Sequence, residues 1–336
     1  MSNYNLTFLI IIFLFSCNSD DNNSILENSD NTADINTKPK GLYTSSFGNE
    51  TALDNNQVNG SLIRVKWSEI EPNKGIYDFS SIEQFRKIIK ARNLKWSLGI
   101  LAGGDSPLWL TESIGADYFE IIGIDNTVKR IPKFWDTIVN ERLALLAEAL
   151  SKEYNEDEDL VLVYVPQMTA NGIEGHFNGV TTDELLDAGL TSDNWVDAVK
   201  ETARIFANAF TKKAIAVEVH EIMGDTSIPN RIMTDLWNEP SLNHRVGAAM
   251  WWISGKNIYQ PNLVNALIDF PGDIYAQAIG RSDQPSRFEN NDYTTIFEQA
   301  QTIGIRYMEL WEYEFVNNTF PQEFESFNEY ANTNFE

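Results

Sequence analysis

The sequence predicts a parallel α/β fold in which eight strands, each followed by a helix, close into a single-domain (β/α)₈ TIM barrel. From Gly41 onward, short apolar runs of strand-like composition alternate with segments of helical periodicity. Eight such units can be counted, which is the number that this barrel needs. No glycine-rich GxGxxG stretch follows a strand. That weakens the runner-up, a doubly wound open sheet that binds a dinucleotide.

The strand-like runs follow one another at regular spacing. Between them lie helix candidates such as residues 80–93, where Ile82, Phe85, Ile88 and Ile89 fall at helical spacing, and residues 195–213. We predict strands at residues 42–47, 61–67, 95–101, 160–167, 214–222, 247–254, 273–280 and 305–312.

The first 40 residues carry export signals instead of fold signals. An apolar run at residues 6–15 is too short to span a bilayer but suits the central region of a secretory signal. Its continuation into "LFSC" resembles a bacterial lipoprotein signal over residues 1–17, which would make Cys17 the lipidated first residue of the mature protein. "MSNYN" before it lacks Lys and Arg, so an ordinary signal peptide is the alternative. Residues 18–40 are polar and predict a disordered tether.

These signals predict an exported protein of the bacterial cell envelope, held at the outer membrane by lipid alone and facing the periplasm or the surface. Residues 41–336 would form the barrel domain. With 43% hydrophobic residues, that length is ample for one core.

Composition limits the partners. Asp and Glu number 49 against 25 Lys and Arg, a net charge of -24 that would repel nucleic acid but leaves neutral and cationic ligands open. One cysteine and three histidines speak against a zinc cluster or a catalytic metal, and we predict no cofactor. The sequence carries no signal for an oligomeric state.

Residues 64–110 carry a specific resemblance. They are similar to the second and third βα units of (β/α)₈ glycoside hydrolases of the β-galactosidase type, which have an Arg-x-x-Trp-x-x-x-Glu-Pro-x-x-Gly-x-Tyr-Asp-Phe stretch and then Pro-x-Trp-Leu. The resemblance implies retaining hydrolysis of a β-linked glycan by two carboxylates, one from strand four and one from strand seven. The matching residues are Arg64, Trp67, Glu71, Pro72, Gly75, Tyr77, Asp78, Phe79, Pro107, Trp109 and Leu110.

The sequence departs from this family twice. The acid/base of the family usually follows an Asn at the end of strand four, whereas Gln167 stands here and the first acid is Glu174. The seventh strand has no glutamate, and Gln277 and Asp283 are the nearest substitutes. Either the nucleophile has moved, or the strand count is off by one, or catalysis has been lost.

Alternation within strands indicates which acids face the barrel interior. In residues 214–222 it points Glu218 and His220 inward, and in residues 305–312 it points Glu309 inward. We predict Glu174 as the general acid, Glu309 as the ionised carboxylate and Glu218 as a reserve for either role.

Further residues are candidates for binding the sugar, because they lie at strand ends and offer aromatic faces or hydrogen bonds. Arg64 would also keep a nearby carboxylate ionised. Each tryptophan fits the core equally well. Glu314 is expected to be exposed, and Glu239 in "WNEP" is expected to cap a helix. The candidates are Arg64, Trp67, Asp105, Trp109, Gln167, His176, His220, Trp252, Gln277, Trp311 and Glu312.

Two other functions stay open. One is a lipid-anchored glycan-binding protein on a catalytically dead barrel, which would use the same aromatic cleft. The other is a purely structural surface protein, which explains the tether but not the inward Glu218, His220 and Glu309.

Overall fold

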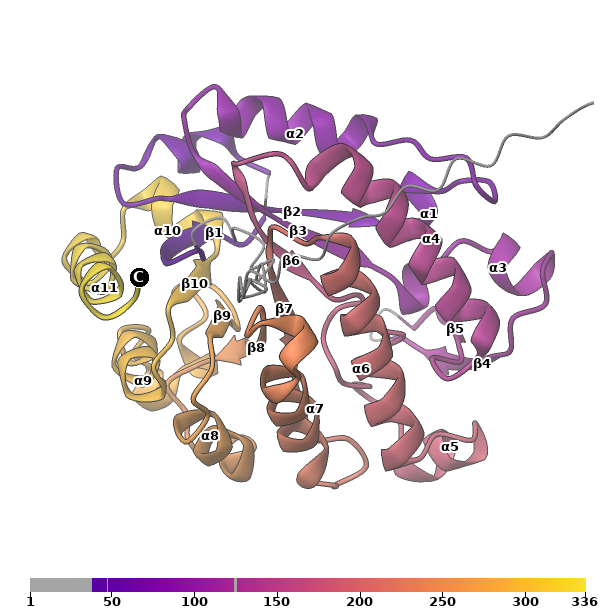
Figure 1. Ribbon diagram of the computed structural model, residues 1–336. Helices are drawn as coiled ribbons and strands as arrows, with labels where there is room; N and C mark the ends of the chain where they lie inside the picture. Colours follow the sequence, from indigo (N-terminus) through magenta and orange to yellow (C-terminus); the bar gives the residue numbers. More distant parts are fainter. Residues whose placement is uncertain (1–37, 47, 124–125) are drawn as a thin grey trace, which may run out of the picture. The chain divides into compact units, whose positions relative to one another are not determined.

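A closed barrel of eight parallel strands, surrounded by helices, forms the fold (Figure 1). The computed structural model describes residues 38–336, apart from residue 47 and residues 124–125. Around the barrel the strands run β1-β10-β9-β8-β7-β6-β3-β2, and each pairs in parallel with its neighbours. The predicted (β/α)₈ barrel is confirmed.

All eight predicted strands are present in the barrel. Several end earlier than predicted, because the chain leaves the sheet to build loops at the carboxyl ends. The strands are β1 (Gly41–Thr44), β2 (Gly60–Lys66), β3 (Lys95–Leu101), β6 (Leu160–Tyr164), β7 (Ala214–Glu218), β8 (Val246–Ile253), β9 (Ile274–Ala278) and β10 (Tyr307–Leu310). An antiparallel hairpin, β4 (Tyr118–Ile122) and β5 (Val128–Pro132), lies apart from them and was not predicted.

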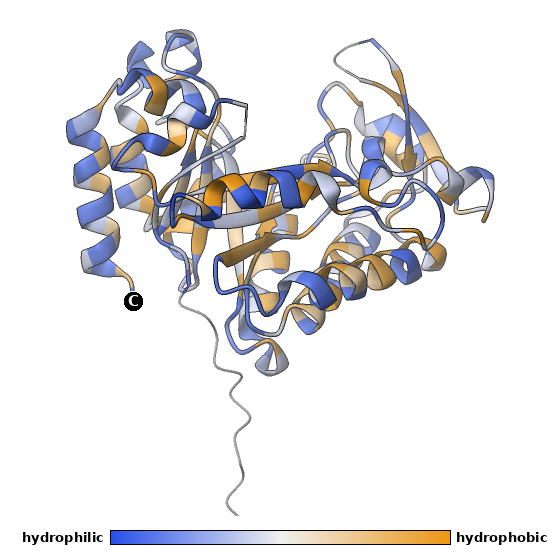
Figure 2. Ribbon diagram, turned by 90° about the horizontal axis from the view of Figure 1, so that it is seen from above, coloured by the Kyte–Doolittle hydropathy of each residue, from blue (hydrophilic) through white to orange (hydrophobic). Residues whose placement is uncertain are grey.

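The helices place one face on the barrel, and Figure 2 shows the alternation of hydrophilic and hydrophobic residues along them. α5 and α6 each begin with a capping box, from Thr181 with Glu184 and from Thr191 with Asn194. The helices are α1 (Trp67–Ile70), α2 (Ser80–Lys90), α3 (Trp109–Glu112), α4 (Thr137–Tyr154), α5 (Thr182–Asp187), α6 (Ser192–Ala209), α7 (Ser227–Asn238), α8 (Pro261–Ile268), α9 (Thr295–Ile303), α10 (Glu312–Asn317) and α11 (Pro321–Asn334).

Two apolar cores flank the strands. The larger lies between the barrel and the helices, and the smaller fills the barrel. The predicted alternation holds in β7, where Ile215 and Val217 face the helices and Ala216 faces inward. The inner core is unusually aromatic, and its large side chains are Tyr43, Tyr164, Trp251, Tyr275 and Tyr307. Phenol hydroxyls inside a barrel need polar partners, and this need shapes the interior.

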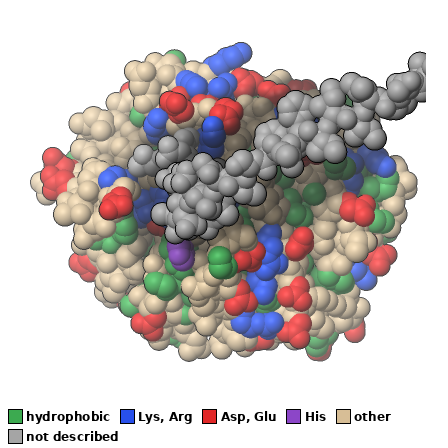
Figure 3. All heavy atoms as spheres, viewed as in Figure 1, with side chains coloured by type: hydrophobic (Ala, Val, Ile, Leu, Met, Phe, Trp, Pro, Cys, Tyr) green, Lys and Arg blue, Asp and Glu red, His purple; other side chains and the backbone are tan. Residues whose placement is uncertain are grey.

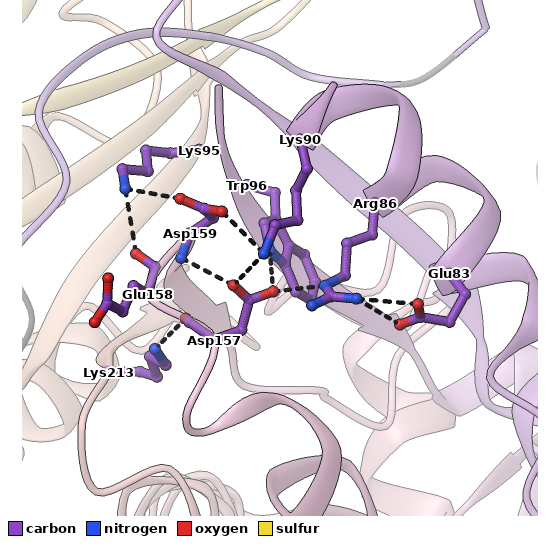
Figure 4. Close-up of polar contacts among 9 residues, drawn as sticks. All are labelled: Glu83, Arg86, Lys90, Lys95, Trp96, Asp157, Glu158, Asp159 and Lys213. Atoms are coloured by element: carbon purple, nitrogen blue, oxygen red, sulfur yellow. Dashed lines mark hydrogen bonds and ion pairs between the residues drawn. The ribbon is translucent and has the colours of Figure 1, made fainter. Parts of the chain in front are cut away.

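Opposite charges are interspersed on the face shown in Figure 3. One cluster, drawn in Figure 4, ties α2 to the start of β6. Asp157 accepts hydrogen bonds from Arg86 at 2.5 Å and Lys90 at 3.0 Å. Burial works to raise the pKa of Asp157, but Arg86, the Asp159 N–H and Lys90 outweigh burial and lower it to about 2. The buried Lys213 donates to the Asp157 carbonyl at 2.6 Å.

The packed chain starts before Gly41, although we predicted a disordered tether up to residue 40. Lys38 donates to the His244 carbonyl at 2.8 Å, and Arg306 donates to the Pro39 carbonyl at 2.9 Å. Cys17 and the tether up to residue 37 lie outside the described residues. No helix in the described part of the chain is long and apolar enough to cross a membrane.

Glu71, the glutamate of the motif that carries the resemblance, holds the connection between β2 and α2. It is fully buried and accepts hydrogen bonds from Trp67 Nε1 and the Gly75 N–H, each at 2.8 Å, and it forms an ion pair with Arg142 from α4. Its carbonyl accepts from Trp109 Nε1 at 2.9 Å. These motif residues therefore form a structural buttress, which we call the Glu71 buttress.

Replacing Arg142 by Met should destabilise the barrel strongly, because it leaves the Glu71 carboxylate buried without its cation. The expected loss in the free energy of unfolding is about 3–5 kcal/mol, measured by urea denaturation. Lys152→Met on the same helix removes only an exposed pair with Glu148, so it should cost about 0.5 kcal/mol or less. Equal stability of the two variants would contradict the buttress.

Candidate active site

The candidate site lies where β6 and β7 end, at the carboxyl end of the barrel. The loop after β6 carries Glu174 and His176, β7 ends at Glu218, and His220 follows it. The sequence predicted all four as site residues. The structure joins them through hydrogen bonds and a ring contact into one group, which we call the Glu–His cluster.

Glu218 is almost fully buried and well supplied with hydrogen bonds. Its Oε2 accepts from the Gly175 N–H at 2.6 Å and lies 2.9 Å from Nδ1 of His220, and its Oε1 accepts from the Trp251 N–H at 3.4 Å. Burial raises the pKa of Glu218 well above its ordinary value, and the negative charge of Glu174 raises it further. Both effects favour the protonated form of the Glu218 carboxyl group.

Glu174 behaves in the opposite way. Its Oε2 lies 2.5 Å from Nε2 of His176. Burial works to raise the pKa of Glu174, but the hydrogen bond and charge of His176 outweigh burial and bring the pKa below its ordinary value. The same contact raises the pKa of His176 against the effect of burial. Glu174 is therefore ionised, with His176 as its cation.

His220 completes the cluster as a neutral ring. Burial lowers the pKa of His220 to about 3, and the neighbouring His176 lowers it too. The two imidazole rings meet edge to face, with centroids 4.6 Å apart. His220 can therefore orient the Glu218 carboxyl through Nδ1 without bringing a charge of its own.

Two carboxyl groups with pKa values displaced in opposite directions form an acid/base pair. Our sequence prediction gave Glu174 the role of the acid and kept Glu218 in reserve. The pKa directions favour the reverse roles, because His176 stands next to Glu174 while Glu218 is buried. The sequence showed His176 two residues away but could not show its direct contact.

Glu309 lies inside the barrel, as strand alternation predicted, and is fully buried. Its Oε1 accepts from the hydroxyls of Tyr164 at 2.9 Å and Tyr307 at 2.6 Å, and its Oε2 accepts from Gln277 Nε2 at 2.6 Å. Burial raises the pKa of Glu309 to about 7, even though these three bonds and the charge of Arg64 lower it. It is thus bound on both oxygens by protein groups and is not held ionised by Arg64 as we expected.

The other acids of residues 309–314 have separate structural contacts. Glu312 accepts from the Ser46 hydroxyl at 3.3 Å and from the Gly48 N–H, which fixes the loop after β1. Glu314 is buried, contrary to the exposed position we predicted, and accepts from the Ser282 N–H at 2.7 Å and Thr319 at 2.5 Å.

The predicted tryptophans are divided among several places. Trp67 and Trp109 belong to the Glu71 buttress. Trp252 is buried in the outer core with its ring 5.7 Å from His220, and Trp311 donates to the Ala278 carbonyl at 2.9 Å. Trp251, which we did not predict, is the tryptophan of β8 that faces inward. Because neighbouring residues of a strand point to opposite faces, the pair "WW" at residues 251–252 indicates that one of the two tryptophans faces inward.

The remaining candidates are polar. Gln167 donates to the Glu218 carbonyl at 2.7 Å and so supports the cluster. Arg64 lies over the Trp251 ring at 6.0 Å. Asp105 forms an ion pair with Lys66 at 3.3 Å. None of the contacts described for the Glu–His cluster involves Asp105. Glu239 directly follows α7 as its C-cap, as expected, and pairs with Arg204 at 2.9 Å.

A cavity of about 270 Å³ borders the Glu–His cluster, because His176 and His220 both line it. Glu221, Tyr259 and Gln260 line it too, and the sequence gave no signal for them. Among the described residues, no group of three or more His, Cys, Asp and Glu is arranged to hold a metal ion.

Comparison with known proteins shows the class of fold. No family model and no curated protein matches the sequence. Among solved structures, the catalytic domain of beta-amylase from Paenibacillus polymyxa matches with a TM-score of 0.60 and 10% identity, over 89% of this chain and 100% of that one. Endo-glycoceramidase II from Rhodococcus sp., as a lactosyl-enzyme intermediate, matches with a TM-score of 0.53 and 11% identity, over 83% and 75%. At such identities the likeness establishes the (β/α)₈ barrel, here shared with glycoside hydrolases.

The stability of the protein should depend on the proton of Glu309. Because its pKa rises from 4.5 to about 7 on folding, the stabilisation is fully present below about pH 4.5 and is lost as the pH rises to about 7. Relative to Glu309→Gln, the wild type should lose free energy of unfolding on the order of 3 kcal/mol across this range. Urea denaturation at several pH values measures the difference, and parallel pH curves for the two proteins would exclude this pKa.

Proposed function

We propose that this chain is a glycoside hydrolase in which Glu218 is the general acid and Glu174 is the ionised carboxylate. One observation carries the proposal: the pKa values of these two carboxyl groups are displaced in opposite directions within one hydrogen-bonded cluster at the carboxyl end of a (β/α)₈ barrel. The barrel that the chain shares with a beta-amylase and an endo-glycoceramidase supports the same class of reaction.

The chemistry follows from the two protonation states. Glu218 donates its proton to the glycosidic oxygen as the bond to the anomeric carbon breaks, and the leaving sugar departs as an alcohol. The N–H groups of Gly175 and Trp251 already point at the Glu218 oxygens and would stabilise the carboxylate that forms. The Glu174 carboxylate either attacks the electron-poor anomeric carbon as the nucleophile or acts as the base that takes a proton from the attacking water.

We propose that the configuration at the anomeric carbon is retained, as in the β-galactosidase-type enzymes that residues 64–110 resemble, with a β-linked glycan as substrate. Retention requires Glu174 to form a glycosyl-enzyme ester that water then hydrolyses, with the Glu218 carboxylate taking the proton from water. Proton NMR of the first sugar released reports the configuration directly.

A glycan-binding protein without catalysis is the second candidate. It is favoured by the near-complete burial of Glu218 and by Gln277, an amide at the inward position of the seventh strand where the resembled family has its nucleophile. Hydrolysis assays with the full chain separate the two functions.

Glu218→Gln and Glu174→Gln should each lower turnover of a polysaccharide by about 100-fold to 10,000-fold, because the amides keep the shape and lose the proton chemistry. The exposed Glu325→Gln on α11 is the matched control and should be unchanged. Glu218→Gln should lose much less activity on an aryl glycoside whose phenol leaves as an anion, because that leaving group needs no proton. Wild-type rates in both active-site variants would refute the assignment.

We further propose that the chain is exported and tethered to the cell envelope through a lipid on Cys17. The support is the short apolar run at residues 6–15, which suits a signal and is too short to span a bilayer. Cys17→Ser should move the protein from the membrane fraction to the soluble fraction, whereas Ser16→Ala should not. Membrane association that survives Cys17→Ser would point to a different anchor.

A further inference from the structure

The cavity beside the Glu–His cluster lies among three loops. The loop after β6 supplies His176 and Asn178, the loop after β7 supplies His220 and Glu221, and the loop after β8 supplies Tyr259. His176 contacts Glu174 and His220 contacts Glu218, so the cavity adjoins the two carboxyl groups that we propose for catalysis.

Tyr259 offers an aromatic face at this cavity. Its side chain is 45% exposed, and its ring meets Trp252 edge to face at 5.2 Å. Trp252 in turn lies 5.7 Å from His220, which fixes the tyrosine relative to the cluster. Ile222 and Met223 add apolar surface to the same wall. A ring held in this way suits the apolar C–H face of a sugar.

Two polar atoms in the wall are unused. Gln260 accepts the Glu221 N–H at 2.7 Å through Oε1 and so ties the loops after β7 and β8 together. Among the described residues, neither Gln260 Nε2 nor Glu221 Oε1 has a hydrogen-bond partner. Gln260 also adopts a left-handed backbone with φ 49°, a conformation that is uncommon outside glycine and is often found at functional sites. Both atoms are buried directly behind the cavity wall, so the loop junction that carries Tyr259 contains unsatisfied polar groups.

The ionisable acid that lines the cavity is Glu221, and the cationic His176 in the lining is already engaged by Glu174. No Lys or Arg occurs among the described residues that line it. Lys256, on the same loop as Tyr259, is turned away and donates to the Ser286 carbonyl at 3.0 Å. The Glu174 carboxylate is paired with His176, and no cation among the residues that the structure describes forms an ion pair with Glu221. A sulfate or carboxylate here would lose its water and meet a like charge, which is costly.

We propose that this cavity is a subsite for one uncharged sugar unit, stacked on Tyr259 beside the Glu221 carboxyl group, so that the protein selects neutral glycans over sulfated and carboxylated ones. The inference rests on the proposed glycosidase function, because it names the substrate class of that site. The net charge of -24 acts in the same direction by repelling polyanions at long range.

Binding to matched glycans tests the subsite. The full chain is titrated calorimetrically with oligosaccharides of a neutral galactan and of carrageenan, a sulfated galactan, and with hydroxyethyl- and carboxymethyl-cellulose as a second pair. The neutral member of at least one pair should bind more than tenfold tighter at high salt, where long-range repulsion is screened. Tyr259→Ala should weaken that binding about tenfold or more, and Tyr259→Phe should preserve it.

Glu221→Gln should narrow the difference between the neutral and the anionic member of a pair, because it removes the repelling charge, while Glu325→Gln should not. If anionic glycans bind as well as neutral ones, or if Tyr259→Ala binds as the wild type does, the subsite proposal is wrong. The proposed function fails separately: tight, Tyr259-dependent binding of neutral glycans with no hydrolysis would keep the subsite and remove the glycosidase. Hydrolysis of neutral and sulfated galactan at equal rates would support the glycosidase function and refute the subsite proposal.

Discussion

A carboxyl group in the middle of the barrel determines how the interior is built. Tyr164 on β6 and Tyr307 on β10 both donate to Glu309, and these two strands lie on opposite sides of the barrel. The Tyr164 bond therefore crosses the lumen, which most barrels fill with branched aliphatic side chains, whereas Tyr307 donates along its own strand. Buried phenol hydroxyls need acceptors, and Glu309 supplies one for Tyr164 and Tyr307. Both of its oxygens accept hydrogen bonds from protein groups, so Glu309 links β6, β9 and β10 across the interior.

The two ends of the barrel use charge differently. At the amino ends of the strands, Asp157 is held ionised by Arg86 and Lys90, and Asp273 pairs with Arg306. The first two pairs join α2 to the start of β6, and the third joins the starts of β9 and β10. At the carboxyl ends, burial favours the protonated form of Glu218. The carboxyl ends thus combine paired acids, Glu174 and Asp105, with one buried acid whose pKa is raised, Glu218.

Sequence alone predicted the architecture well because the fold depends on periodicity. Alternating strand and helix patterns gave all eight strands, and alternation within strands placed Glu218 and Glu309 inside. The sequence pattern could not predict which side chains of the loops contact one another. The role of Glu174 depends on His176 touching it, and the burial of Glu314 depends on Ser282 from another loop. Loop residues such as Gln260 show no regular spacing of apolar and polar residues, so the sequence could not predict which of them line the cavity.

The Glu71 buttress also bears on how proteins of this architecture are recognised. Its residues are the ones that make the sequence look like a glycoside hydrolase, yet they lock a βα connection and touch none of the acids of the Glu–His cluster in the contacts described. Selection for a stable chain can preserve such a lock while the catalytic positions drift. Proteins identified by this motif would therefore share the barrel structure. They need not share a reaction, because the catalytic residues can change independently of the motif.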